Sequence, residues 1–401
     1  MSNLQDKGTV RRNQFTAFAL LFNTISWFFI GRLVILRIGD AFSDTSLLQL
    51  VYPAAIIVSA IFASVFLLRV RRTRLFYGWL LLGVFASLCL AIPLGSSLEM
   101  AMILAGLLGT SVGIGTPVCF SYFAESTGVE NRGKFGGIIL LVTISTVPFV
   151  MLSIPTLGLV ASAILLAAWR AWSLPLMLLA PKNSTLTRPT DVHVPSFTAV
   201  LRNRAFYLYF AAWFMFTLVD SFEAVVVSAP VEALGFYVRI LEPIVTGLSA
   251  IIAGAVSDWV GRKRVLIFGF VSLGIAYAIV GLFSQAWISW LFYSVIDGIA
   301  LGLLWVIFVI VLWGDLSGKG SERFYALGET PFFLTYIFSI ILTPYVMSIP
   351  TTSSFSLAAF FLFVAVIPLL YAPETLPEKT MKDRELKQYL EKAQKVKEKY
   401  A

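Results

Sequence analysis

Largely apolar stretches recur along almost the whole chain, and they constrain its fold more than any other feature of the sequence. A run of about 20 such residues spans the hydrocarbon core of a bilayer as an α-helix. Lipid offers no hydrogen-bond partner to a backbone N–H or C=O group, so these segments must be helices rather than open strands. We count twelve predicted spans, at residues 14–36, 46–69, 75–94, 99–123, 136–155, 158–180, 205–228, 239–257, 265–284, 286–313, 328–348 and 354–372.

The distribution of charge predicts the orientation of these spans. Only 13% of the residues are charged, against about a quarter in a soluble domain, and the net charge is +8. With the N-terminus placed in the cytoplasm, 26 of the 30 Lys and Arg residues fall on the cytoplasmic side, as the positive-inside rule requires. The basic excess therefore indicates topology, not a nucleic-acid partner. We expect a multi-pass protein of the cell or plasma membrane, embedded in the lipid bilayer, with both termini cytoplasmic and the first span retained.

The two halves of the sequence resemble each other at an offset of about 190 residues. "MLSIPT" (151–156) closes the fifth span as "VMSIPT" (346–351) closes the eleventh, and "LAPK" (179–182) ends the sixth as "YAPE" (371–374) ends the twelfth. A third pair begins with a basic turn, "RTRLFYGWLLLG" and "RKRVLIFGFVSLG". Such duplication is typical of secondary transporters, whose substrate site lies near mid-membrane between the repeats.

We therefore expect an all-α integral membrane protein with twelve transmembrane helices in two six-helix repeat halves. The halves are residues 1–180 and 205–372. Residues 181–204, rich in Pro, Ser and Thr, form a cytoplasmic linker. Residues 373–401 form a charged cytoplasmic tail with helical spacing of Glu and Lys.

One loop, "GAVSDWVGRKRV" (254–265), combines glycines with opposite charges at a defined spacing. Gly254 would let a neighbouring helix approach closely, and Gly261 would permit a tight turn. Asp258 lies where it can meet a helix N-terminus or a nearby arginine. The following cations, which anchor the loop in the cytoplasm, are Arg262, Lys263 and Arg264. This motif resembles the signature cytoplasmic loop of the major facilitator superfamily, and the resemblance implies that family's fold.

Further stretches resemble sugar-porter-like members of the superfamily. "GIGTPVCFSYFAESTGVENRGKFGG" (113–137) is similar to their segment between spans 4 and 5, and "PET" (373–375) is similar to the sequence that follows their last span. "GDLSGKGSER" (314–323) occupies the equivalent loop of the second half. The resemblance implies a cytoplasmic gate that bridges the halves when the cavity opens outward. Its expected ionic members are Asp258, Arg262, Glu125, Arg132, Asp315 and Arg323.

The sequence also departs from the family pattern. The signature loop is usually most complete between spans 2 and 3, but here Leu68 stands where the duplication would place the equivalent of Asp258, so we expect an asymmetric gate. Span 4 lacks the intramembrane arginine of proton-coupled members, and span 5 lacks the Gly-Pro pattern of drug–proton antiporters. Both absences count against a multidrug antiporter.

Ionisable residues inside spans are costly, so each one suggests a function. Asp297 in the tenth span would carry a coupling proton, or would be a hydrogen-bonded carboxylate that holds Tyr293 or a neighbouring helix. Arg32 and the pair Asp220 and Glu223 lie in the outer parts of spans 1 and 7, where they would form a salt bridge across the outer mouth or simply reach the interface.

Polar and aromatic residues of spans 1, 7 and 10 would line a cavity suited to a small polar solute. These residues are Asn23, Ser26, Trp27, Trp213, Thr217 and Trp305. Arg170 in span 6 is expected to reach the cytoplasmic face, and we assign it no role.

The sequence contains no cluster of metal ligands, no phosphate-binding loop and no nucleophile elbow, so we expect neither an enzyme nor a metal or other cofactor. We predict a monomeric secondary transporter that moves a small polar organic solute, such as a sugar or related metabolite, by alternating access with proton coupling as a symporter. One alternative is a drug or organic-cation exporter, because acidic residues outnumber basic ones within the spans. An alternative of another class is a membrane sensor or partner-binding protein that does not transport.

Overall fold

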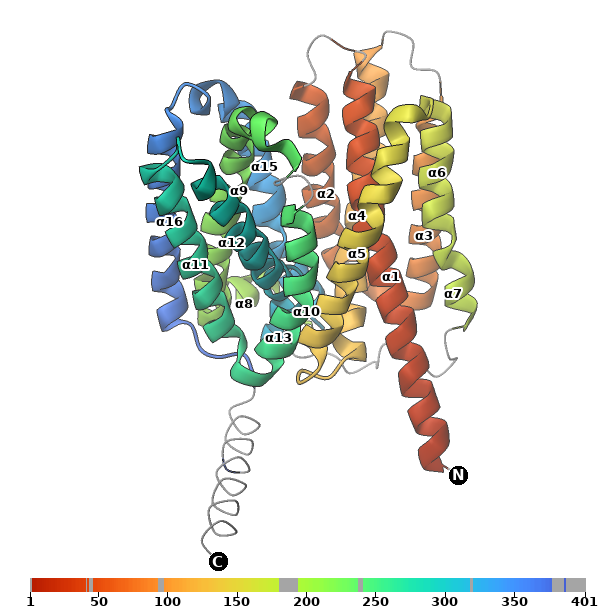
Figure 1. The fold of residues 1–401 in the computed structure, drawn as a ribbon. Coiled ribbons are helices and arrows are strands. Elements are labelled where there is room, and N and C mark those ends of the chain that lie inside the picture. The colour runs from red at the N-terminus through yellow and green to blue at the C-terminus, as the bar shows by residue number, and fades with distance from the viewer. Residues whose placement is uncertain are drawn as a thin grey trace, which may run out of the picture.

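The computed structural model describes residues 2–40, 42, 46–92, 97–179, 194–236, 241–317, 320–376 and 386. These residues are almost entirely helical, and no strand occurs among them (Figure 1). Most of the predicted linker and tail, at residues 180–193 and 377–401 apart from Leu386, lies outside the described part. The expectation of a helical tail therefore stays a prediction.

The N-terminal half forms a bundle of long helices with two 3₁₀ turns. Its elements are α1 (Ser2–Gly39), α2 (Ser46–Phe66), η1 (Leu67–Arg69), α3 (Arg72–Cys89), α4 (Leu98–Ser126), α5 (Arg132–Ser153), η2 (Ile154–Thr156), α6 (Leu159–Ala171) and α7 (Ser173–Leu179).

The C-terminal half forms a second bundle, preceded by the short helix α8 (Phe197–Arg202). Its elements are α9 (Arg204–Phe236), α10 (Glu242–Val260), α11 (Arg262–Leu282), α12 (Trp287–Trp305), the π-helical segment η4 (Val306–Val311), α13 (Leu312–Ser317), α14 (Glu322–Gly328), α15 (Thr330–Val346) and α16 (Thr351–Tyr371).

Within the described residues, eleven helical stretches are long and apolar enough to cross a membrane. The predicted third span is α3, which is not among the eleven because its 18 residues include Arg72 and Arg74. It nevertheless packs against α4 and α6 within the N-terminal bundle, so the predicted arrangement of twelve helices is confirmed.

Two spans are interrupted where the sequence predicted continuous helices. The sixth span breaks between α6 and α7, and the tenth contains the π-helical segment η4. The eleventh, predicted to begin at residue 328, begins earlier with α14, and the single turn residue Glu329 separates α14 from α15. Such interruptions expose backbone groups, and in membrane proteins they are tolerated where protein or a cavity surrounds them.

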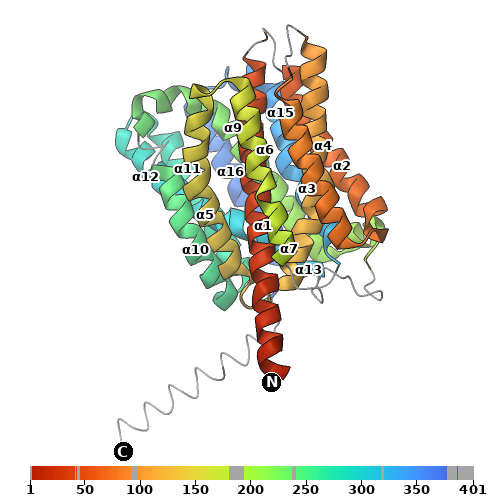
Figure 2. The same cartoon turned by 90° about the vertical axis from the view of Figure 1, so that its right-hand side faces the viewer.

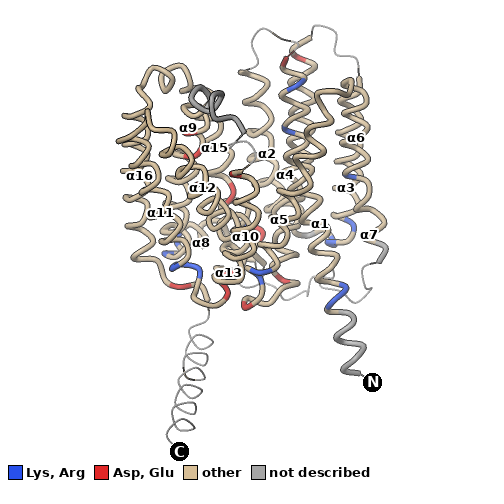
Figure 3. Tube along the Cα trace, in the orientation of Figure 1, with Lys and Arg blue, Asp and Glu red and all other residues tan. Residues whose placement is uncertain are grey.

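The first residues of α1 and the last residues of α16 lie at the same end of the bundle, here called the terminal end (Figures 1 and 2). The other end is called the opposite end. Basic segments of several helices gather toward the terminal end (Figure 3).

Glycines bring helices into close contact in both halves. Gly109 and Gly113 of α4 face α2, and Gly298 and Gly302 of α12 face α10. A Cβ at any of the four would overlap a backbone carbonyl oxygen of the facing helix. Small residues four apart allow this approach, and their recurrence shows that the two bundles are built alike.

Candidate functional site

Buried charged side chains from both halves meet at the terminal end. Asp315 in α13 accepts a hydrogen bond from Arg262 Nε at 3.0 Å through one carboxylate oxygen and from Arg132 Nη1 through the other. Arg262 is the first residue of α11, and Arg132 is the first residue of α5 in the other half. All three side chains are 3% exposed or less. Because a charge left unpaired after burial is strongly destabilising, the cluster stabilises this end only while the halves stay together.

Asp258 adds a second contact between the halves. Its Oδ1 accepts the backbone N–H of Gly133 at 2.9 Å, and its Oδ2 accepts that of Lys134 at 2.7 Å. The carboxylate thereby binds the N-terminus of α5, where unpaired N–H groups and the helix dipole favour an anion. It also accepts a hydrogen bond from Arg262 Nη1 at 2.5 Å. The close approach of α10 to the N-terminus of α5 depends on Gly254, since a Cβ there would overlap the Gly133 carbonyl oxygen.

A second ionic cluster joins the halves on the other side of the terminal end. Arg72, the first residue of α3, donates from Nη1 to Glu125 at 2.6 Å and from Nη2 to Glu322 at 2.7 Å. Glu125 lies in α4 of the same half, and Glu322 opens α14 of the other half. Glu322 is fully buried. Arg72 and Glu322 were not expected in the gate from the sequence.

The two clusters are related by the internal repeat. Arg72 and Arg262, Glu125 and Asp315, and Arg132 and Glu322 are each 190 residues apart. Two of these pairs keep the sign of their charge, whereas the third reverses it. In the first cluster, Arg132 pairs with the carboxylate of Asp315 across the interface. In the second cluster, its repeat counterpart Glu322 pairs with Arg72.

The remaining residues of the predicted gate occupy supporting positions. Arg323 lies outside both ionic clusters, because its guanidinium donates to the backbone oxygens of Ser64 and Pro195. Gly261 adopts a φ of 103°, which favours glycine. The Lys263 ammonium donates to the Leu370 carbonyl at 2.7 Å, and the Arg264 side chain is exposed.

The predicted Pro-Glu-Thr sequence supplies a cap for α11. Oε1 of Glu374 accepts the backbone N–H of Arg262 at 2.8 Å, and Oε2 accepts that of Lys263 at 3.2 Å. This cap fixes the first turn of the helix that carries Arg262.

A cavity of about 70 Å³ lies between the halves near the middle of the spans. Helices α1, α4 and α5 wall it on one side, and α12, η4 and α15 on the other. Its lining residues are Thr24, Ile25, Phe28, Phe29, Val112, Thr116, Phe120, Leu140, Trp305, Val309, Ile310, Glu329, Phe332 and Phe333. We call this space the central cavity.

Glu329 supplies the carboxylate in the wall of the central cavity. It lies at the break between α14 and α15, directly before Thr330 and Pro331. Its Oε1 is buried and has no hydrogen-bond partner among the described residues, although the indole of Trp313 lies nearby. This residue was not predicted from the sequence, because it falls at the edge of the predicted span 328–348.

Aromatic rings separate the central cavity from a larger one toward the opposite end. Phe28 of α1 contacts Phe332 and Phe333 of α15, with ring centroids 6.2 and 5.6 Å apart. These three residues line both cavities, and we call them the aromatic layer. The second space, here the outer cavity, has a volume of about 220 Å³, and Arg32 and Asp220 lie in its wall.

The outer cavity revises the predicted salt bridge across the mouth. Arg32 and Asp220 face the same space, but no direct ion pair joins Arg32 to Asp220 or Glu223 within the described residues. Arg32 instead lies over the Tyr336 ring, 4.3 Å from its centroid. Within the described residues, the aromatic layer and not an ion pair lies between the two cavities.

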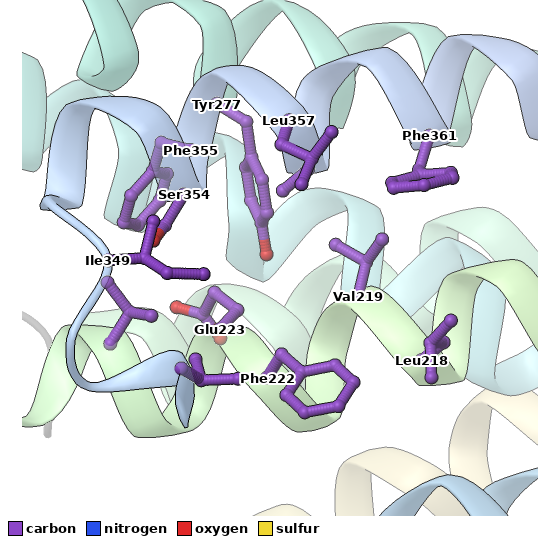
Figure 4. A pocket seen from close by; sticks show the side chains of 13 residues that line it. Leu218, Val219, Phe222, Glu223, Tyr277, Ile349, Ser354, Phe355, Leu357 and Phe361 are labelled. Atoms are coloured by element: carbon purple, nitrogen blue, oxygen red, sulfur yellow. The ribbon is translucent and has the colours of Figure 1, made fainter. Parts of the chain in front are cut away.

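Glu223 faces a different, mostly apolar pocket of about 250 Å³ between α9, α11 and α16 (Figure 4). Its carboxylate accepts a hydrogen bond from the Tyr293 hydroxyl, and Tyr277 points into the same space. Tyr293 therefore partners Glu223. One expected role of Asp297 was to hold Tyr293, and the described part of the structure shows no such contact. The Asp297 side chain is buried, with 4% exposure, and has no hydrogen-bond partner in the described part of the chain.

Of the residues expected to line the substrate cavity, the structure places only Trp305 in the wall of the central cavity. Asn23, Trp27 and Trp213 are fully buried in the bundle cores. Trp213 stacks on Phe308, with ring centroids 4.9 Å apart. The position of a residue in a predicted span does not reveal whether its side chain points into a bundle core or into a cavity.

Arg170 is buried, contrary to the expectation that it reaches the surface. Its guanidinium lies between the rings of Trp27 and Trp79, 4.5 and 4.0 Å from their centroids. Its Nη1 donates to Asn23 Oδ1 at 2.7 Å. Because the cation is held by aromatic faces inside the N-terminal bundle, it belongs to the core of that half. No group of three or more His, Cys, Asp or Glu residues in the described structure could hold a metal ion.

Residues 241–397 match the model of the Major Facilitator Superfamily. No curated protein matches the chain. Similar solved structures include the human organic anion transporter MFSD10 (TETRAN), with 12% identity, a TM-score of 0.63, and coverage of 90% of this chain and 99% of that one. They also include the proton:xylose symporter XylE bound to 6-bromo-6-deoxy-D-glucose, with 14% identity, a TM-score of 0.67, and coverage of 92% and 97%. At these identities the likeness concerns the fold.

Proposed function

We propose that the chain is a member of the major facilitator superfamily and a secondary transporter that carries a small organic solute by alternating access between its two halves. The observation that carries the proposal is the line of spaces between the halves. The outer cavity leads to the aromatic layer, the aromatic layer to the central cavity, and the central cavity ends above the ionic clusters of the terminal end.

The terminal end is proposed to be cytoplasmic, because the basic loops concentrate there. In this conformation the ionic clusters close the cytoplasmic side, and the aromatic layer closes the passage from the central cavity to the outside. Exchange of the solute would require the two closures to open in turn. We also propose that the protein works as a monomer in the cell membrane.

Proton coupling is a further part of the proposal. A coupled proton needs a protein group that can take it up within the membrane. Asp297 is supported for this role by its burial and by its lack of a hydrogen-bond partner among the described residues.

The central cavity offers little to a sugar. The prediction of a sugar or related metabolite depends on loop motifs far from the cavity. The wall of the central cavity offers few hydrogen bonds to a sugar, because Thr24 and Thr116 already donate their hydroxyl groups to carbonyl oxygens of their own helix.

The proposal is tested by reconstituting the purified protein in liposomes. Labelled sugars, organic anions and organic cations are offered singly, with an excess of the same unlabelled solute inside. We expect at least one class to enter faster than into protein-free liposomes. If no class crosses faster, although the protein is folded and inserted, the transport function is wrong and a sensor or partner-binding protein becomes the better account.

A further inference from the structure

We infer that the central cavity binds a compact organic cation, such as a quaternary or protonated amine. This inference rests on the proposed transport function and names its substrate class. It is carried by three features that meet in the cavity: aromatic rings from both halves, one carboxylate, and irregular helices that hold them.

Aromatic rings from both halves line the cavity and pack against one another. Phe29 stacks on Trp305, with ring centroids 5.9 Å apart. Phe332 meets Trp305 edge to face, with centroids 5.8 Å apart. Phe28 and Phe333 complete the wall toward the outer cavity. The face of an aromatic ring carries negative electrostatic potential and attracts a cation, with the strongest attraction for tryptophan.

Glu329 supplies the negative charge. No ion pair joins it to a lysine or arginine among the described residues, and no Lys or Arg lines the central cavity. Arg32 lies in the wall of the outer cavity. A carboxylate in such apolar surroundings is costly unless a positive charge or a proton neutralises it. A bound ammonium ion would supply that charge.

The backbone holds these groups in place. Trp305 directly precedes the π-helical segment η4, and Val309 and Ile310 of that segment line the cavity. Glu329 lies at the helix break of the eleventh span. Single π-helical turns and broken helices in membrane spans recur at binding sites. Both irregularities of the C-terminal half therefore face the same space.

Other solute classes fit this wall less well. An anion would meet the Glu329 carboxylate without a basic partner in the wall. A sugar would leave most of its hydroxyl groups unpaired, which is costly in a buried site. In this conformation the volume of about 70 Å³ leaves no room for a drug-sized solute.

The test compares cations with neutral molecules of the same shape. Binding of tetramethylammonium, choline and tetraethylammonium to the purified protein is measured by titration calorimetry, beside 3,3-dimethylbutan-1-ol, the neutral isostere of choline. We expect at least one cation to bind, and choline to bind at least about tenfold tighter than its isostere. Glu329→Gln should abolish the preference, and Trp305→Leu should weaken cation binding severalfold.

Matched controls separate these effects from a general loss of structure. Glu99→Gln alters an exposed glutamate, and Trp287→Leu alters an exposed tryptophan of the same span as Trp305. Both should bind cations as the unaltered protein does. Each variant must elute as a single species in size-exclusion chromatography.

Three results would overturn the inference: no cation binds to the folded protein, choline and its isostere bind equally, or Glu329→Gln keeps the preference. Flux measurements in liposomes distinguish failure of this inference from failure of the proposed function. If a sugar or anion enters but no cation binds, the cation site is wrong and the transport function stands. If a cation binds but no solute enters, the site stands and the transport function is wrong.

Discussion

Arg72 Nη2 lies 2.7 Å from Glu322 Oε1, and this ion pair joins the two halves of the chain through side chains that are at most 4% exposed. Glu322 occupies the position that Arg132 holds in the first half of the repeat. At this repeat position the first half has a positive charge and the second half a negative one, and both take part in ion pairs across the terminal end.

Removing this charge should loosen the terminal end. Glu322→Gln leaves Arg72 with Glu125 as its partner in the same half and deletes the ion pair across the interface. We expect a cysteine at Thr116, in the central cavity, to react about tenfold faster with a membrane-impermeant maleimide applied from the terminal end. That factor corresponds to about 1.4 kcal/mol. The protein carries Cys89→Ala and Cys119→Ala for this measurement, and Glu99→Gln, far from the interface, should leave the rate unchanged. An unchanged rate in Glu322→Gln would mean that the ion pair does not hold this end closed.

Gly254→Ala should prevent full closure, because the added Cβ would overlap the Gly133 carbonyl oxygen. Forcing an extra methyl group into such a contact costs about 1–3 kcal/mol. The same labelling experiment should again show faster modification from the terminal end. Gly78→Ala is the control, since no atom of a neighbouring residue lies within 4 Å of the place that its added Cβ would take. Equal rates in the two variants would show that the added methyl group at position 254 does not prevent closure.

Asp297→Asn should uncouple transport from the proton gradient. The amide cannot carry the proton, so accumulation of the solute against its gradient should be lost. Exchange of labelled for unlabelled solute should persist, because Asp297 does not line the central cavity. Both rates are measured in liposomes with an imposed pH difference. Gradient-driven accumulation that survives in Asp297→Asn would remove this residue from the coupling mechanism.

Arg170→Lys should destabilise the N-terminal half. A lysine keeps the charge but loses the planar stacking on Trp27 and Trp79 and the hydrogen bond to Asn23. We expect a loss of about 2 kcal/mol, seen as a lower apparent melting temperature of the purified protein. Arg202→Lys, at an exposed position, should melt like the unaltered protein. If both variants melt alike, the two tryptophans do not stabilise the cation.

The spans and the repeat were predictable from the sequence, because hydropathy and spacing are properties of the chain alone. The π-helical turn after Trp305 was not, because no change in hydropathy marks it. The break before Pro331 does carry a sequence signal, because proline lacks the N–H that a continuous helix needs. Glu329 was missed because it falls at the edge of the predicted span 328–348.

Side-chain direction was equally hidden from the sequence. Trp27 and Trp305 both lie in apolar spans, but one packs in a bundle core and the other lines the cavity. Arg170 looked like a residue near a helix end, and only the structure shows the two rings that hold it. For the gate, the spacing of Asp258 and Arg262 was informative, whereas Glu322 was not recognised because its charge is reversed relative to its repeat partner.

The central claim is that the two ionic clusters hold the halves together at the terminal end. Spin labels at Arg74→Cys and Arg264→Cys, two exposed positions related by the repeat, report the separation of the halves by pulsed electron paramagnetic resonance. With Cys89 and Cys119 replaced by Ala, the parent protein should give one dominant distance. Addition of Asp315→Asn and Glu322→Gln, one from each cluster, should shift a large fraction of molecules to longer distances. Identical distance distributions in the two proteins would contradict the claim.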